Sequence, residues 1–299
     1  MISVIIPVYK NNDLFIKNLD HNLIFLDDCQ IIVINDDPEK SLRSHLDQFK
    51  QITLIDNKKN LGFGESVNRG VKQSDSKYIM LLNSDVVLND KSYLTALNYF
   101  KKNDVFAVSF SQKEKDGSIV GKNKIYWQEG FFSHQKVDGL NFGYNGWAEG
   151  GACIINKDTF LKLGGFDPLF SPFYWEDIDL SYRAWKSGYQ IIFEPKILVI
   201  HHHQSTISKY FTKKQIKIIA YRNQIIFAWK NLTHFKLILQ HLLNLPLWLI
   251  KSLVKGDYLF LIAFFNALFT LPKLLVKKIK LKKLFTVSDD KILSLFKNE

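Results

Sequence analysis

The stretch Tyr78-Ile-Met-Leu-Leu-Asn-Ser-Asp-Val-Val-Leu88 decides the fold of this 299-residue chain. Five apolar or aromatic residues run directly into three polar ones, which is the pattern of a strand buried on both faces of a parallel sheet. Open α/β sheets bind their ligands at the carboxyl ends of such strands. Asp85 could therefore hold a divalent cation that also contacts substrate phosphates. The alternative is a plain turn, because Asn, Ser and Asp are common turn residues.

Strands and helices alternate around this stretch. We expect strands at residues 3–9, 30–34, 52–55 and 105–110, and helices after residue 11 and at 40–49, 65–72 and 89–104. Residues 111–146 are weakly patterned and predict a hairpin or a mobile loop. Beyond them we expect a strand within 148–155, helices at 158–163 and 176–188, and two short strands at 189–193 and 197–200. Alternating strands and helices predict a mostly parallel sheet covered by helices.

Five polar clusters lie where predicted strands end or helices begin. They are Asn35-Asp36-Asp37, Asn60–Gly64, Asn83–Asp85, His201–His203 and Trp175-Glu-Asp-Ile-Asp179. Acidic clusters at strand ends suit a nucleotide and a metal ion. The second cluster lacks the complete G-x-G-x-x-G pattern of a dinucleotide site. Adjacent histidines of a strand point to opposite faces, so at most two of the three could face one site.

Composition argues against two classes of protein. The chain has two cysteines, Cys29 and Cys153, which are far apart and have no partner at metal-ligand spacing. This argues against a disulfide scaffold and a zinc finger, and it fits a reducing compartment. The length predicts about two domains. Because a strand begins almost at residue 1, we expect no signal peptide.

The positive charge is confined to the last third of the chain. Residues 1–204 contain 23 Lys and Arg against 25 Asp and Glu, whereas residues 205–299 contain 17 against 4. We therefore expect a near-neutral domain at 1–204 and a basic region at 205–299. Its Leu- and Phe-rich segments, with lysines at 273, 277, 278, 280, 282 and 283, predict amphipathic helices on an anionic membrane surface. The alternative is a helical cap that packs on the first domain or on a second subunit.

Several motifs together resemble the inverting GT-A glycosyltransferases of family 2, in particular the branch of rhamnosyltransferases and galactofuranosyltransferases. The resemblance covers about residues 1–205 and implies an α/β GT-A fold with a Rossmann-like, mostly parallel central sheet. The motifs in chain order are Pro7-Val-Tyr9, the acidic cluster at 35–37, Asn60-x-Gly62-Phe-Gly64 with Asn68-x-Gly70, Leu-Leu-Asn83-Ser-Asp85, Gly150-Gly-Ala152, Gly164-Gly-Phe-Asp-Pro168, Trp175-Glu-Asp-Ile-Asp-Leu-Ser-Tyr-Arg183, and Pro195 with His201 six residues later.

The resemblance implies a donor site built mainly from the first half of the chain. Asp36, with Asn35 or Asp37, would contact the base and ribose of a nucleotide sugar. Asp85 closes an Asn-Ser-Asp version of the family's D-x-D motif and would hold Mg²⁺ or Mn²⁺ on the diphosphate, with His201 as a further ligand. The other residues implied to bind the donor are Pro7, Tyr9, Asn60, Gly62, Asn68, Asn83 and Ser84. Asn35 and Asn83 stand where family members usually have Asp.

The resemblance implies that the general base and the acceptor site lie in the second half. Asp177 would take the proton of the attacking hydroxyl, while a cation offsets the charge of the leaving diphosphate. One base without a second, nucleophilic carboxylate predicts direct displacement with inversion. Acceptor contacts are implied for Gly150, Gly151, Trp175, Glu176 and Arg183. Arg183 could instead pair with Asp179, one helical turn earlier.

The sequence therefore predicts a metal-dependent inverting glycosyltransferase, peripheral on the cytoplasmic face of the cell membrane. It would transfer a sugar from dTDP-rhamnose or a UDP-sugar to a lipid-linked surface polysaccharide, and it could form a homodimer. Two other classes stay open. A nucleotidyltransferase also uses acidic strand ends and a metal ion, and a non-catalytic module could bind nucleic acid through the basic region 205–299. We favour a glycan partner and no nucleic acid.

Overall fold

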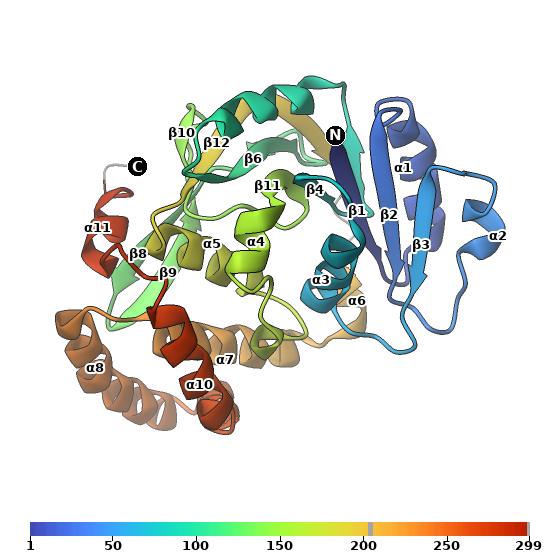
Figure 1. Ribbon diagram of the computed structural model, residues 1–299. Helices are drawn as coiled ribbons and strands as arrows, with labels where there is room; N and C mark the ends of the chain where they lie inside the picture. Colours follow the sequence, from blue (N-terminus) through green and yellow to red (C-terminus); the bar gives the residue numbers. More distant parts are fainter. Residues whose placement is uncertain (203–205, 298–299) are drawn as a thin grey trace.

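The computed structural model describes residues 1–202 and 206–297 and is built on one large mixed sheet (Figure 1). The strand order is β10-β12-β6-β11-β4-β1-β2-β3. Four of these strands are parallel neighbours: β1 (Ile2–Val8), β2 (Cys29–Asn35), β3 (Ile52–Asp56) and β4 (Tyr78–Leu82). As the opening stretch predicts, β4 lies inside the sheet, and Ile79–Leu82 are buried. The fold is therefore the expected α/β GT-A type.

The remaining strands make the sheet mixed. β6 (Val105–Lys113) runs parallel to β12 (Gln190–His201), whereas β11 (Ala152–Asn156) lies antiparallel between β6 and β4. The short strands β5 (Val86–Leu88), β7 (Ile119–Val120) and β10 (Gly143–Tyr144) add to this half. Because β12 and β4 end on the same side, His201 comes close to Asp85.

Helices cover both faces of the sheet. α1 (Asn12–Leu23) and the 3₁₀ helix η1 (Ser92–Lys101) pack on one face. The other face carries α3 (Phe63–Gln73), α4 (Lys157–Lys162) and α5 (Glu176–Lys186), as Figure 1 shows. The two short helices α2 (Arg43–Leu46) and η2 (Pro168–Phe170) lie in connections.

Three local predictions need correction. The segment 89–104 forms a 3₁₀ helix rather than an α-helix; its apolar residues Leu94, Leu97 and Phe100 recur every three residues, the period of that helix. α2 is shorter than the predicted helix. The two strands around Pro195 are one strand, β12, whose irregularity between Glu194 and Leu198 accommodates the proline. The hairpin predicted within residues 111–146 is confirmed: β8 (Asn123–Gln128) pairs with β9 (Phe131–Lys136), and the turn, Glu129-Gly130, has two positive φ angles.

The last third of the chain is helical. α6 (Thr206–Tyr210) is followed by α7 (Lys213–Asn231), which shares its core with α5 and the hairpin, while Phe227 is fully buried. Beyond it come α8 (Phe235–Val254), α9 (Tyr258–Leu268), α10 (Leu271–Lys282) and α11 (Asp289–Ser294). The predicted boundary at 204/205 falls outside the described residues, as does His203.

One helix of the described part, α8, is long and apolar enough to cross a membrane by length and composition; α9 and α10 pass the same test only as a pair bent by 64°. α8 contains 20 residues. One of its faces packs on the protein, because Leu237, His241 and Leu245 are buried.

Candidate active site

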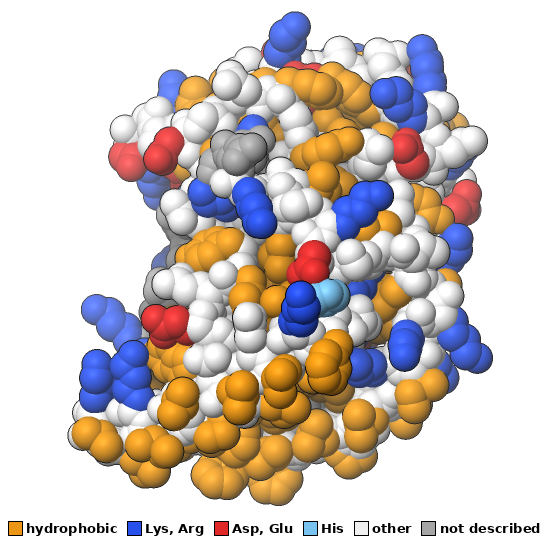
Figure 2. All heavy atoms as spheres, turned by 90° about the vertical axis from the view of Figure 1, so that its left-hand side faces the viewer, with side chains coloured by type: hydrophobic (Ala, Val, Ile, Leu, Met, Phe, Trp, Pro, Cys, Tyr) orange, Lys and Arg blue, Asp and Glu red, His pale blue; other side chains and the backbone are white. Residues whose placement is uncertain are grey.

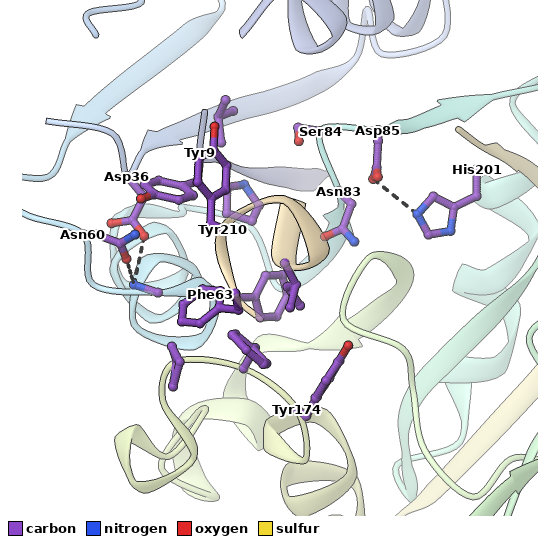
Figure 3. A pocket seen from close by; sticks show the side chains of 17 residues that line it. Tyr9, Asp36, Asn60, Phe63, Asn83, Ser84, Asp85, Tyr174, His201 and Tyr210 are labelled. Atoms are coloured by element: carbon purple, nitrogen blue, oxygen red, sulfur yellow. Dashed lines mark hydrogen bonds and ion pairs between the residues drawn. The ribbon is translucent and has the colours of Figure 1, made fainter. Parts of the chain in front are cut away.

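A cavity of about 340 Å³ opens at the carboxyl ends of β1, β2 and β4 (Figure 3). We call it the strand-end cavity. It is lined by the segments that follow β1, β2, β3 and β4, by residues 172–174 before α5, by the end of β12 and by residues of α6 and just beyond it. The predicted site residues that line it are Pro7, Tyr9, Asp36, Asn60, Gly62, Asn83, Ser84, Asp85 and His201. This is the edge at which open α/β sheets bind ligands.

Asp36 shapes the loop that forms one wall of this cavity. Its two carboxylate oxygens accept hydrogen bonds from the backbone N–H groups of Leu61 and Gly62, each at 2.8 Å. Gly62 has φ +81°, and a Cβ there would lie 3.2 Å from the Pro172 carbonyl oxygen. Only glycine fits this turn without strain, so the loop can approach a ligand closely.

Asp85 and His201 form the candidate metal site of the strand-end cavity. The Asp85 Oδ1 and His201 Nε2 atoms are 3.3 Å apart, and Glu114 Oε1 lies 3.9 Å from His201 Nδ1. Burial works against protonation of His201, but Asp85, Glu114 and Glu149 outweigh it and raise the His201 pKa. Such an acidic environment favours a cation.

The donor set fits a metal ion that is shared with a substrate. Among residues 1–202 and 206–297, no three His, Cys, Asp or Glu side chains form a ready-made metal cluster. Mg²⁺ is commonly held by one or two carboxylates together with substrate phosphates. Asp85 and His201 supply two protein ligands of suitable type, so substrate oxygens and water would complete the coordination.

A second cavity, of about 440 Å³, adjoins the first at the start of α5; we call it the helix-start cavity. It is lined by Gln112, His134, Trp147, Glu149, Gly150, Gly151, Trp175, Glu176, Asp177, Ile178 and Ala220. Asn83, Tyr174 and His201 line both cavities. The two cavities therefore meet at these three side chains, with Asp85 in the wall of one and Asp177 in the wall of the other.

The glycine pair before β11 lets the two cavities meet. A Cβ at Gly150 would lie 2.6 Å from the Phe63 ring, and one at Gly151 would lie 2.3 Å from the Asn83 side chain. Asn83 N–H also donates to the Gly151 carbonyl oxygen at 3.0 Å. Larger residues would push the two segments apart, so these glycines set the width of the junction.

The backbone is strained immediately before α5. Tyr174 and Trp175 have φ angles of 70° and 74°, in the left-handed region that bulky residues rarely adopt. Asn223 of α7 holds this segment, because its Nδ2 atom lies 2.8–2.9 Å from the carbonyl oxygens of Phe170, Phe173 and Tyr174. Strain of this kind concentrates at functional sites, where the surrounding structure maintains it.

Asp177 has the environment of a general base. Burial raises its pKa to about 7, and the carboxylate of Glu149 adds to the rise, although the Ile178 backbone N–H donates to Oδ1 at 2.8 Å and opposes it. A base is most effective when its pKa lies near the working pH. Burial and the neighbouring Asp177 also raise the pKa of Glu176 well above its ordinary value.

Glu149 is the site residue that sequence reasoning missed. Its carboxylate accepts hydrogen bonds from Gln112 and, at 2.9 Å, from Asn123, and it acts electrostatically on both His201 and Asp177. The only signal in the sequence is its place directly before Gly150-Gly151. The hairpin residues that bring it into the site come from a stretch without a clear pattern.

Four predicted site residues line neither cavity, and their roles need correction. Asn68 uses both ends of its amide on the backbone of Phe166, at 2.8 and 2.9 Å. Asn35 is bonded within its own turn and to Asp56, and Asp37 is buried in the same turn. These side chains shape the loops and do not face a donor.

Arg183 is the fourth of these residues. Its guanidinium is buried, pairs with Asp179 at 2.7 Å and donates to the carbonyl oxygens of Leu163 and Gly165. The i,i+4 alternative is therefore confirmed, and acceptor binding is wrong. Trp175 does line the helix-start cavity but is only 5 % exposed, because it packs on Phe227 and His134.

Comparison with known proteins identifies the family of the chain. The family model described as glycosyl transferase family 2 matches residues 3–159, just over half of the chain. The chain therefore belongs to glycosyl transferase family 2. It is 26 % identical over 174 residues to a poly-beta-1,6-N-acetyl-D-glucosamine synthase of Staphylococcus epidermidis, which covers 56 % of this chain and 42 % of that protein. The chain thus spans less than half the length of the curated relatives it matches.

Solved structures share the fold at low sequence identity. GalNAc-T7, solved with UDP, GalNAc and Mn²⁺, has a TM-score of 0.60 at 15 % identity, covering 77 % of this chain and 48 % of that one. The mannosyltransferase PcManGT from Pyrobaculum calidifontis, solved with GDP-Man and Mn²⁺, has a TM-score of 0.53 at 12 % identity, covering 91 % and 75 %. The second likeness extends into the C-terminal helices.

Proposed function

We propose that this chain is a metal-dependent, inverting glycosyltransferase that uses a nucleotide-sugar donor, dTDP-rhamnose or a UDP-sugar. The observation that carries this proposal is the junction of the two cavities. One wall presents Asp85 and His201, the other presents Asp177, and Asn83 and Tyr174 stand between them. A donor and an acceptor bound on the two sides would meet at this junction.

The residues of the strand-end cavity would bind and orient the donor. Asp36 fixes the loop of Gly62, which would lie against the nucleotide. The rings of Tyr9 and Tyr210, whose centroids are 6.0 Å apart, would lie beside the nucleotide. Asp85 and His201 would hold Mg²⁺ or Mn²⁺. When bound, such an ion offsets the charge that develops on the leaving diphosphate.

The residues of the helix-start cavity would activate the acceptor. Asp177 accepts the proton of the attacking hydroxyl as the new bond forms between the acceptor oxygen and C1 of the sugar. The bond between C1 and the diphosphate oxygen breaks, and the nucleoside diphosphate leaves with the electron pair. A single displacement inverts the configuration at C1, whereas a double displacement requires a carboxylate nucleophile on the opposite face.

The acceptor that we propose is a growing surface polysaccharide, linked to a lipid at the inner face of the cell membrane. The similarity to poly-beta-1,6-N-acetyl-D-glucosamine synthases supports a polysaccharide product. An apolar surface on α8–α10 supports the membrane, and Figure 2 shows orange side chains gathered along the bottom of the molecule. We call it the apolar patch; its exposed residues include Phe235, Leu239, Leu242, Leu243, Leu247, Ile250, Leu253, Val254, Phe265, Phe269, Leu275 and Ile279.

The lysines near the apolar patch divide into two groups. Lys273, Lys280, Lys282 and Lys283 are exposed and suit anionic headgroups. Lys277 binds Asp167, and Lys278 donates to the carbonyl oxygens of Trp229 and Leu232, so these two are corrected from headgroup ligands to internal contacts.

Vesicle sedimentation tests the membrane proposal. Vesicles containing phosphatidylglycerol should bind the protein more tightly than phosphatidylcholine vesicles, and added salt should weaken the binding. The double variant Leu243→Ser/Leu247→Ser should lose most of it. The control Leu94→Ser changes an exposed leucine on η1 and should bind normally. Equal binding by both variants would refute docking through α8.

A donor panel tests the catalytic proposal. The protein is incubated with Mn²⁺ and each of a set of sugar nucleotides, and release of nucleoside diphosphate is measured. We expect release from one donor, its loss with EDTA, and strong loss in Asp85→Asn. The control Asp90→Asn changes an exposed acid beyond β5 and keeps a side-chain oxygen that can accept from the Ser92 backbone N–H, so it should be normal. No release from any donor would overturn the assignment, and pyrophosphate formation from a nucleoside triphosphate would favour a nucleotidyltransferase.

A further inference from the structure

A third cavity, of about 390 Å³, lies between the β8–β9 hairpin and the C-terminal helices; we call it the hairpin cavity. Its volume lies within the usual range of small-molecule sites, about 300–1,000 Å³. It is lined by Gln128, Glu129, Phe131, Ser133, Tyr221, Gln224, Trp248, Lys251 and Phe260. Much of its wall comes from α7, α8 and α9, which lie beyond the residues that the family model matches.

The walls of the hairpin cavity are fixed by specific contacts. The hairpin turn lies so close to α8 that a Cβ at Gly130 would be 2.6 Å from Asn244 Cβ. His241 Nδ1 is 2.7 Å from the Gly130 carbonyl oxygen, and the Trp248 indole N–H donates to the Glu129 carbonyl oxygen at 3.3 Å. Trp248 is thereby held in one orientation, as a preformed binding site requires.

The hairpin cavity and the helix-start cavity are lined by adjacent residues of two elements. On β9, Ser133 lines the hairpin cavity and its neighbour His134 lines the helix-start cavity. On α7, Tyr221 lines the former and Ala220 the latter. Because adjacent residues of a strand face opposite sides, the two cavities lie on opposite sides of β9. A chain molecule whose end reaches Asp177 would pass between β9 and α7 to enter the hairpin cavity.

The lining of the hairpin cavity combines aromatic rings with uncharged polar groups. Phe131, Tyr221, Trp248 and Phe260 supply apolar surface, and Gln128, Ser133 and Gln224 supply hydrogen-bonding groups. One carboxylate, Glu129, is matched by one ammonium group, Lys251, which lies 4.7 Å from the Trp248 ring centroid. A formally neutral lining with both kinds of surface suits a sugar, which has apolar C–H faces and many hydroxyl groups.

We propose that the hairpin cavity is a subsite for saccharide units of the acceptor chain that lie behind its reacting end. The subsite depends on the proposed glycosyltransferase function and adds to it a preference for acceptors of several units. α8 carries both Trp248 of this cavity and Leu247 and Ile250 of the apolar patch. A glycan that leaves a membrane at the patch would pass the hairpin cavity before it reaches Asp177.

Two other occupants fit the cavity less well. A diphosphate would require several cations, but the carboxylate of Glu129 offsets the charge of Lys251. An acyl or polyprenyl chain would leave the polar groups of Gln128, Ser133 and Glu129 without the hydrogen bonds that water gives them. The experiment below tests the lipid as a separate ligand.

The experiment measures binding of the full chain to immobilised bacterial surface oligosaccharides of one to eight units. We expect longer oligosaccharides to bind better than single sugars. Ser133→Trp fills the hairpin cavity. It should weaken the binding of the longer oligosaccharides about tenfold and bring their affinity close to that of single sugars. The matched control Gln135→Trp changes an exposed residue two positions further along β9 that lines none of the three cavities, and it should bind like the wild type.

A second variant and a second readout separate folding from binding. Gln128→Ala removes one exposed polar group of the cavity and should weaken long oligosaccharides by a smaller factor. Release of nucleoside diphosphate without acceptor should be unchanged in both variants, because the donor cavity is untouched. If this release occurs but Ser133→Trp binds all lengths like the wild type, the subsite is refuted and the enzyme assignment stands.

Three further outcomes also decide the question. If the chain releases nucleoside diphosphate but binds no oligosaccharide, the subsite alone is overturned. If Ser133→Trp abolishes binding of a fluorescent polyprenyl phosphate but leaves oligosaccharide binding intact, the cavity binds a lipid and the saccharide subsite is overturned. Absence of nucleoside diphosphate release from any donor overturns the proposed function and the subsite together.

Discussion

Two groups of carboxylates lie at α5, and they differ in their partners. The first group is Glu149, Glu176 and Asp177, which face one another around the helix-start cavity. The second is Asp167 and Asp179, which face α7. The first three are half-buried and the last two are buried, so the acids most shielded from water are not the candidates for chemistry.

The two groups of carboxylates differ because cations lie beside the second group. Lys230 of α7 lies 2.8 Å from Asp179 and 2.6 Å from Asp167, and Arg183 also pairs with Asp179. Burial alone would raise the Asp167 pKa, but Lys230 and Lys277 lower it below its ordinary value. In the first group burial raises the pKa of Asp177 and that of Glu176, and the neighbouring acids add to the rise because no cation of the described residues opposes it. The pKa of Asp177 is raised and that of Asp167 is lowered, and this opposite direction distinguishes the candidate base from an acid that holds α7 in place.

Asp177→Asn should give the largest effect. Loss of the base should reduce transfer by a factor of about 10³. Stability should change little or rise, because the variant removes a buried charge that has no cation beside it. Rates are measured with saturating donor, and donor affinity by titration. The control Asp158→Asn alters an exposed acid in the first turn of α4 and should be fully active. Full turnover by the Asp177 variant would remove it from the role of base.

Lys230→Met should affect stability. Removing one partner of a buried pair leaves Asp167 and Asp179 without their shared cation, which typically costs about 3–5 kcal/mol. Chemical denaturation measures the change, and Lys236→Met, at an exposed lysine of α8, is the control. An unchanged denaturation midpoint would show that the two carboxylate groups are not as different as their partners indicate.

The smallest effect is a shift in the pH profile. Asp177 must be ionised to act as a base, so activity should rise with pH through about 7 and fall below it. Glu149→Gln removes a neighbouring charge and should move the rise in activity to lower pH. A fall of about half a unit in the Asp177 pKa would roughly triple the ionised fraction of Asp177 at pH 6. Glu39→Gln changes an exposed carboxylate and should leave the profile in place.

Stability should respond to pH with opposite signs in the two groups. The folded-state pKa of Asp177 lies above that of an unfolded chain, so its ionisation lowers stability as pH rises between about 4 and 7. The folded-state pKa of Asp167 is depressed, so its contribution is complete above the unfolded pKa and is lost as pH falls towards the folded one. Lys230→Met should reduce this acid-side loss.

Much of the fold and the donor side of the site could be predicted from the sequence. The apolar run before Asn83 predicts an interior strand, and polar residues after parallel strands meet at one sheet edge whatever the loop details. Asp36, Asp85 and His201 accordingly lie in one cavity. The roles of Asn35, Asn68 and Arg183 could not be predicted, because a motif does not reveal whether a polar side chain faces a ligand or the backbone of its own loop.

The sequence by itself determined the order of strands and helices, the family motifs and the basic, apolar last third, because each depends on neighbouring residues. Tertiary structure alone decided that Glu149 joins Asp177, that Lys230 neutralises Asp179 from 51 positions away, and that Trp248 meets the hairpin. Charge and solvation act through space. The pKa and the role of an acid therefore depend on which distant segments the folded chain brings beside it.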